Sequence, residues 1–334
     1  MTGPPPAVAQ TRTAVRRALG PGNDRLVLVA CSGGADSLAL AAAAAFAGPR
    51  TGWRVGLVTV DHKLQAGSAD RAAAVAAWAT AAGLAPVLVA PVTIDPADPV
   101  GPEAAARHAR YEALLQQAEE YAAAALLLGH TLDDQAETVL LALARGAGPR
   151  GLAGMPARRE VDGVALLRPM LGVRRTTLRD ACAAQGLTPW EDPHNSDDRY
   201  ARARVRSSAL PALVAALGPG VVGNLAQTAA QLAVDASYLD GLAASAYEGC
   251  RRDSGLSVDA LRALPDALRS RVLHTWALEL GAPPAALGHR HVAALEALVT
   301  DWHGQGATAL PGGIEVHRAG GWLSLTLPAG SPPE

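Results

Sequence analysis

The chain has 334 residues, which is enough for two or three domains with hydrophobic cores. Its net charge of −2 argues against a generally basic coat for nucleic acid, so any basic surface must be local. Three cysteines without short pairing fit a reducing cytoplasm better than a disulfide framework, and no apolar run reaches the roughly 18 residues of a membrane span. We therefore expect a cytoplasmic protein.

Apolar runs and helical stretches alternate along the first half of the chain. The expected strands are residues 26–31, 55–60, 86–90 and 125–130. The expected helices are residues 11–20, 38–46, 68–82 (capped by Ser68), 101–121 and 133–145. This alternation predicts right-handed βαβ units in an α/β fold, with a doubly wound, Rossmann-like parallel sheet. Ligands in such sheets bind at the carboxyl ends of the strands.

The motif Ser-Gly-Gly-Ala-Asp-Ser, residues 32–37, follows the first expected strand and leads into a helix. Its glycines allow a sharp bend with bare N–H groups, and these, the helix N-terminus and the hydroxyls of Ser32 and Ser37 suit phosphate oxygens. Asp36 would repel phosphate unless a magnesium ion lay between them. The alternative is a glycine-rich turn without a ligand. No Gly-Lys-Ser/Thr ending is present, which excludes the P-loop of kinases and GTPases.

Polar residues also follow the second and fourth expected strands. Asp61 and His62 end the second strand, and His130 ends the fourth. Three residues apart on the next helix, Asp134 and Glu137 share a face, where they could complete a magnesium shell or position an incoming amine. The alternative is a capped helix with an acidic first turn, which the helix dipole favours. His62 could be a base, bind ribose or be structural.

Arginines supply two further candidates. Arg107 and Arg110 lie one turn apart on the helix of residues 101–121, where they could bind phosphates or simply face solvent. Residues 145–206 hold twelve arginines against seven acids, and the excess peaks where four arginines surround Tyr200: Arg199, Arg202, Arg204 and Arg206. Guanidinium groups beside an aromatic ring suit RNA, whereas pairing with the acids of residues 192–198 is the alternative.

The organisation changes after residue 146. We expect one more strand at 164–170, a helix at 176–186, a helical segment over 224–299 with breaks near Gly255 and residues 281–284, and a β-hairpin in the last stretch, from residue 310. Trp190 is expected to be packed. These signals divide the chain into a flexible segment with a short helix (1–22), an α/β domain (23–215) and a helical domain with a β tail (216–334).

Residues 32–37 resemble the pyrophosphate loop of the N-type ATP pyrophosphatases, the PP-loop superfamily. That family cleaves ATP between its α and β phosphates, adenylates a carbonyl-type oxygen and releases pyrophosphate. Further motifs occur in a specific order: Val-Asp-His at 60–62, residues 103–111, Gly-His-Thr-Leu-Asp-Asp-Gln-Ala-Glu-Thr at 129–138, residues 145–155, Arg-Pro-Met-Leu at 168–171 and Glu-Asp-Pro-His-Asn at 191–195. Together they resemble tRNA(Ile)-lysidine synthetases over about residues 25–215, and the tail from Leu310 resembles that family's later domain more loosely. The resemblance implies a catalytic PP-loop domain at 23–215 and a helical tRNA-binding domain with a β tail at 216–334.

The resemblance implies a magnesium-dependent ligase that adenylates carbon 2 of the wobble cytidine in tRNA-Ile with a CAU anticodon. The side-chain amine of free lysine then displaces AMP to give lysidine. By position, the implied ATP site is Ser32, Gly33, Gly34, Ala35, Asp36, Ser37, Asp61, His62 and His130, with Mg²⁺ on Asp36 and Asp134. The implied catalytic residues are Asp36, Arg107, Asp134 and Glu137, and the implied tRNA contacts are Arg145, Arg199, Arg202 and Arg206. Gln65 stands where relatives usually carry a basic residue.

Two other interpretations stay open from the sequence. Another PP-loop enzyme such as a tRNA thiolase would need reactive or cluster-binding cysteines, and no Cys-x-x-Cys is present. A non-catalytic, nucleotide-sensing RNA-binding module would not need the carboxylates of Asp36, Asp134 and Glu137. The roles of Asp133, Asp134 and Glu137 are not separated by the sequence, and a homodimer is a further open expectation.

Overall fold

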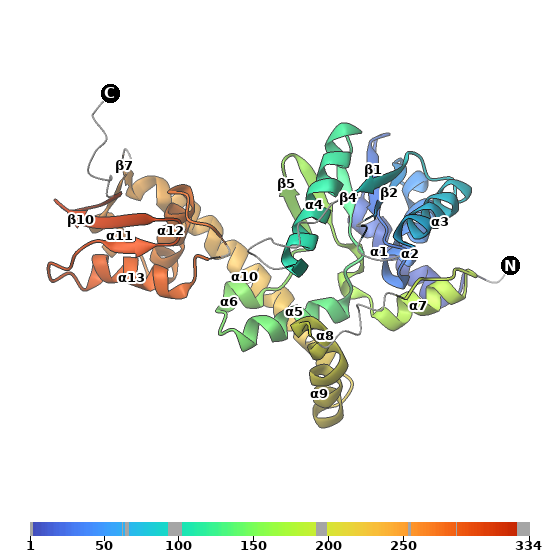
Figure 1. Cartoon of the computed structure of the whole chain (residues 1–334). Helices are drawn as coiled ribbons and strands as arrows, with labels where there is room; N and C mark the ends of the chain where they lie inside the picture. Colours follow the sequence, from blue (N-terminus) through green and yellow to red (C-terminus); the bar gives the residue numbers. More distant parts are fainter. Residues whose placement is uncertain are drawn as a thin grey trace. The chain divides into compact units, whose positions relative to one another are not determined.

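The computed structural model describes residues 3–61, 63, 67–92, 102–191, 199–252, 255–284 and 286–325. The chain divides into two compact units, Met1–Ala233 and Val234–Glu334 (Figure 1). The division falls inside the long helix α10 (Val221–Cys250), and the domain limits expected at residues 22 and 215 stay predictions.

The first unit is built on a sheet in the order β3-β2-β1-β4-β6-β5. The strands are β1 (Leu26–Ala30), β2 (Arg54–Asp61), β3 (Val87–Pro91), β4 (Ala125–Leu127), β5 (Arg158–Val161) and β6 (Val164–Leu167). All of these strands run parallel except β5, which pairs antiparallel with β6. The expected doubly wound parallel sheet is therefore confirmed.

Helices cover both faces of this sheet. The helices of the unit are α1 (Pro6–Leu19), α2 (Ala35–Arg50), α3 (Ser68–Ala81), α4 (Pro102–Glu120), α5 (Leu132–Ala144), α6 (Pro149–Leu152), α7 (Arg175–Ala183), α8 (Ala201–Arg204) and α9 (Leu210–Leu217), with turns η1 (Pro169–Gly172, 3-10) and η3 (Val205–Ala209, π-helical). Val27 and Val29 pack with α1, α2, α3 and α7 on one face, and Leu26 and Leu28 pack with α4 on the other.

Three local expectations are corrected. Gly67, with φ +77°, precedes α3 and no side chain caps this helix, so Ser68 is its first residue rather than its cap. The strand expected over 164–170 ends at Leu167, because Pro169 starts a 3-10 turn. Strand β5 was not expected because it is arginine-rich and mostly exposed; it exists as an edge partner of β6.

The second unit carries an antiparallel sheet in the order β7-β8-β11-β10-β9. Its elements after α10 are β7 (Arg251–Arg252), β8 (Gly255–Ser257), α11 (Val258–Ala263), α12 (Asp266–Glu279), α13 (His289–Thr300), β9 (Thr308–Leu310), β10 (Ile314–Ala319) and β11 (Trp322–Leu325). The expected hairpin is formed by β10 and β11. The helical segment expected over 224–299 does break near Gly255, but the two strands at this break, β7 and β8, were not expected; β8 finds its backbone partners in the distant β11 and in β7.

In the part of the chain that the structure describes, no single helix is long and apolar enough to cross a membrane. The pair that passes this test together by length and composition, Ala201–Leu217 and Val221–Cys250, is bent by 101°.

Candidate active site

The loop between β1 and α2 is folded around the side chain of Ser37. The Ser37 hydroxyl accepts from the N–H of Ser32 over 3.1 Å and donates to the carbonyl of Gly34 over 3.0 Å. Gly33 takes φ +83°, a conformation that favours glycine. Gly34 is the N-cap residue of α2, and no side chain caps this helix. The first N–H groups of α2 and its dipole therefore form a site for an anion.

Segments distant in sequence hold this loop in place. The N–H of Trp190 donates to the carbonyl of Gly33 over 2.9 Å, and the Trp190 ring packs under the guanidinium of Arg71 at 3.6 Å. Gly129, just after β4, approaches so closely that an added Cβ would lie 3.2 Å from Cα of Ser37. The expected packing of Trp190 is thus observed, at the loop itself.

The loop opens into a cavity of about 520 Å³. Residues at the ends of β1, β2 and β4 line it together with the start of α2, and Arg110, Arg175, Arg179 and Trp190 also contribute. The sequence-predicted site residues in its lining are Ser32, Gly34, Ala35, Asp36, Ser37, His130, Asp134 and Arg206. A cavity at the carboxyl edge of a parallel sheet is the expected place for a ligand.

The two acids of α5 have different surroundings. Asp134 forms a capping box with Thr131: its Oδ2 accepts from the Thr131 N–H and hydroxyl, each at 2.8 Å, and its own N–H donates to that hydroxyl. Its Oδ1 accepts from Arg175 at 2.9 Å. Glu137, one turn further along, has a wholly buried side chain. The first turn of α5 is therefore capped, as the simpler interpretation predicts, and also ion-paired.

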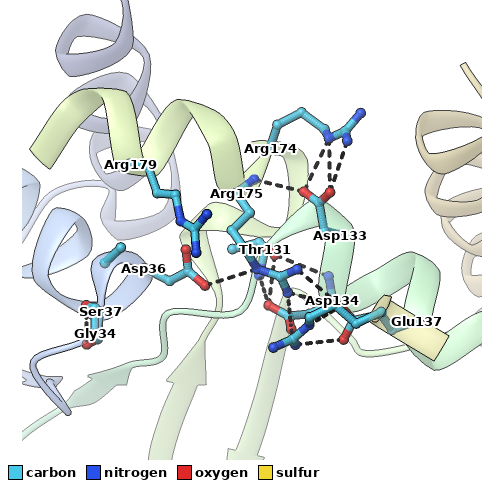
Figure 2. A network of polar contacts seen from close by, with 12 residues as sticks. Gly34, Asp36, Ser37, Thr131, Asp133, Asp134, Glu137, Arg174, Arg175 and Arg179 are labelled. Atoms are coloured by element: carbon cyan, nitrogen blue, oxygen red, sulfur yellow. Dashed lines mark hydrogen bonds and ion pairs between the residues drawn. The ribbon is translucent and has the colours of Figure 1, made fainter. Parts of the chain in front are cut away.

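Three guanidinium groups surround Glu137, and Figure 2 labels one of them, that of Arg175. Arg175 donates to its Oε1 at 3.1 Å and 3.2 Å, Arg202 to its Oε2 at 3.0 Å, and Arg206 to its two oxygens at 2.8 Å and 2.9 Å. Buried carboxylates persist in proteins when they are paired in this way. Arg202 and Arg206, predicted to contact tRNA, thus reach the acids of α5.

Asp133 points toward the start of α7 (Figure 2). Its carboxylate accepts from Nε of Arg174 at 3.2 Å and from the backbone N–H of Arg175 at 2.8 Å. The three neighbouring acids therefore have different contacts: Asp133 accepts hydrogen bonds from the start of α7, Asp134 caps α5, and Glu137 pairs with three arginines.

Burial and charge shift the acidity of the groups at the cavity. Burial raises the pKa of Asp36 to about 6, against the opposing effect of Arg175. Burial acts in the same direction on Asp134, but Arg175 and the hydrogen bonds from Thr131 outweigh it and lower its pKa. Burial and the charge of Arg168 lower the pKa of His130 to about 3, so this imidazole is neutral near pH 7.

The oxygens of Asp36 fit a cation bound with a phosphate. Its Oδ2 lies 3.4 Å from Nε of Arg175, while its Oδ1 is buried and has no hydrogen-bond partner among the described residues. Within those residues, no group of three or more histidine, cysteine or acidic side chains is arranged to hold a metal. A magnesium ion here would therefore rely on Asp36 and on ligand oxygens. Asp134 could join them only if its Oδ1 were released from both Arg175 and Arg206.

Comparisons with known proteins agree over nearly the whole chain. The family model described as a PP-loop domain matches residues 8–213, and the TilS substrate binding domain matches residues 256–324. The tRNA(Ile)-lysidine synthase of Salinispora tropica is 64% identical over 97% of this chain and 97% of its own length. The chain belongs to the tRNA(Ile)-lysidine synthase family. The Thermobifida fusca member is 52% identical over 98% of this chain and 99% of its own. These relatives support ATP-dependent tRNA modification by a ligase, and not the thiolase or sensor alternatives.

A solved structure shares the fold. The U34-tRNA thiolase NcsA from Methanococcus maripaludis with its [4Fe-4S] cluster matches 68% of this chain and 80% of its own, with a TM-score of 0.57 and 18% identity. That similarity supports the PP-loop fold of this chain and carries no information on its substrate or residues.

The remaining predicted residues lie apart from the acid cluster. Arg107 is exposed and its guanidinium lies over the ring of Tyr111, while its neighbour Arg110 lines the cavity. Asp61 accepts from the N–H of Lys63 at 3.1 Å. Arg145 and Arg199 are exposed. His62, Gln65 and residues 192–195 lie outside the described residues.

Sequence reasoning missed Arg174 and Arg175. Both stand at the start of α7, a few residues after the end of the parallel strand β6. Ligands bind at the carboxyl ends of parallel strands, so applying this rule to β6 as well would have drawn attention to both arginines.

Proposed function

We propose that this chain joins free lysine to carbon 2 of the wobble cytidine in tRNA-Ile with a CAU anticodon, using ATP and releasing AMP and pyrophosphate. The observation that carries the proposal is the shared cavity: the uncapped N-terminus of α2, Asp36 and the acid-bearing start of α5 all open into it. An anion site and a charged cluster within one cavity suit a reaction between a triphosphate and a cationic amine.

The loop residues Ser32 to Ser37 would hold the triphosphate through backbone N–H groups and the two serine hydroxyls. Mg²⁺ would lie at Oδ1 of Asp36, where it would neutralise phosphate charge and make pyrophosphate a better leaving group. Arg206 lines the same cavity and would stabilise negative charge at the α-phosphate, and the prediction places Arg107 nearby. Neutral His130, whose Nδ1 has no partner among the described residues, can accept a hydrogen bond from an amine.

Lysine and tRNA would approach the acidic start of α5. Glu137 and Asp134 carry the negative charge that suits the lysine ammonium group, although arginines occupy them in this structure. Exposed Arg145 and Arg199 would contact the tRNA backbone, together with Arg202 and Arg206. Three free, buried cysteines fit a cytoplasmic location. The homodimer stays a prediction.

The test is pyrophosphate release from ATP by the purified protein with Mg²⁺, lysine and unmodified CAU-anticodon tRNA, omitting one component at a time. We expect release to require this tRNA and labelled lysine to become attached to it. Pyrophosphate release without transfer of lysine to the tRNA would contradict lysidine as the product. ATP binding without any pyrophosphate release would contradict the proposed enzymatic activity.

A further inference from the structure

Arg175 contacts carboxylates from two helices at once. Its Nη2 lies 2.9 Å from Asp134 and 3.1 Å from Glu137 on α5, and its Nε lies 3.4 Å from Asp36 on α2. Figure 2 shows the side chain between these acids. Its own backbone N–H donates to Asp133, so the start of α7 is anchored independently of the guanidinium. The residue thus lies between the nucleotide loop and the acids of α5.

The three contacts are unequal in length. The contacts to Asp134 and Glu137, at 2.9 Å and 3.1 Å, are shorter than the 3.4 Å contact to Asp36. Arg202 and Arg206 also pair with Asp134 and Glu137. Asp36, in contrast, has its ion pair with Arg175 among the described residues. Loss of Arg175 would therefore leave the acids of α5 with partners and Asp36 without its ion pair.

We propose that Arg175 is a positioning residue that joins Asp36 to the acid pair Asp134 and Glu137 and competes with the metal for Asp36. This inference rests on the proposed function. While the nucleotide is absent, the guanidinium neutralises Asp36; when a metal-bound triphosphate arrives, the 3.4 Å contact lengthens while the shorter contacts to α5 persist. The shorter contacts would then keep Arg175 beside the acids proposed to receive the amine, at the edge of the nucleotide site.

The inference makes metal affinity and turnover move in opposite directions. A positive charge beside Asp36 repels an approaching cation, so its removal should tighten metal binding. The same removal frees the acids of α5 from the nucleotide loop and should slow the reaction, because misplacement of reacting groups is costly. A residue needed only for folding would weaken both.

The test measures binding of Mn²⁺ with α,β-methylene-ATP, which cannot be split between its α and β phosphates, by electron paramagnetic resonance of the free ion. The variants are Arg175→Gln, Arg175→Lys and the control Arg54→Gln. Arg54 forms an exposed ion pair with Asp24 and stands at the start of β2, the end of this strand that lies away from the cavity. For Arg175→Gln we expect half-saturation at about tenfold lower Mn²⁺ and pyrophosphate release slowed at least about tenfold. Unchanged or weaker Mn²⁺ binding in a folded Arg175→Gln protein would overturn the inference.

If Arg175→Gln does not fold, as judged by its circular dichroism, Arg175→Lys carries the test. A lysine keeps the charge near Asp36 but lacks the planar fork that reaches several carboxylates. We expect wild-type Mn²⁺ affinity with slower turnover; wild-type turnover would overturn the inference. The binding measurement needs neither tRNA nor lysine, so a wild-type protein that fails to transfer lysine would contradict the proposed function separately.

Discussion

Arg206 donates from Nε to Oε1 of Glu137 over 2.8 Å, and the carboxylate that accepts has no exposed surface. The contact joins η3 to α5 across 69 residues of chain. Arg202, one turn earlier, reaches the same carboxylate from α8. The basic stretch that resembles an RNA-binding segment is therefore also a structural partner of the candidate active site.

Glu137→Gln should destabilise the protein by about 3–5 kcal/mol, the usual cost of breaking a buried ion pair. The change would leave three guanidinium groups around an uncharged side chain. Urea unfolding measures the effect. In the exposed pair Arg158–Glu160, Glu160→Gln is the matched control and should cost below about 1 kcal/mol. Equal losses in the two variants would contradict the importance assigned to burial.

Arg202→Ala with Arg206→Ala should weaken tRNA binding and flatten its dependence on salt, because fewer counterions are released from phosphates. Both side chains remain about 30% exposed (28% and 31%), so an RNA phosphate can reach them. Titration of tRNA at several salt concentrations gives the slope. Weaker tRNA binding with an unchanged salt dependence would mean that these arginines only pair with Glu137 and do not contact tRNA phosphates.

Asp36→Ala should abolish pyrophosphate release and leave tRNA binding nearly intact. The Oδ1 of Asp36 is the buried, unpartnered oxygen at the nucleotide loop, and no tRNA contact is predicted for it. Pyrophosphate release and tRNA affinity are measured on the same preparation. A parallel loss of both would show that Asp36 is needed for the structure rather than for ATP.

The cysteines should react slowly with the thiol reagent DTNB at pH 8 in the folded protein. Burial raises the pKa of Cys31 and Cys250 and raises that of Cys182 to about 11, which lowers the fraction of reactive thiolate at this pH. Denaturant should release all three thiols, because all three are free. Rapid labelling of a folded sample at any one of them would contradict the buried positions.

Much of the fold and half of the site could be predicted from local pattern. Short apolar strands alternating with helices determine a doubly wound sheet, because a parallel strand needs a helical crossover. Ser32 to Ser37 predict a phosphate loop because glycine, hydroxyl and helix start occur within six neighbouring residues. Here the interacting groups are neighbours in sequence, and spacing alone reveals them.

Only the tertiary structure decided which charges meet. Arg175 and Glu137 are 38 residues apart and Arg206 and Glu137 are 69 apart, and nothing in local spacing predicts that these residues meet. The same holds for β5 and β8, whose short stretches become strands because β6 and β11 offer them hydrogen bonds. Ion pairs and strand pairs depend on which segments the sheet and helices bring within a few ångströms, and that is set by packing of the whole unit.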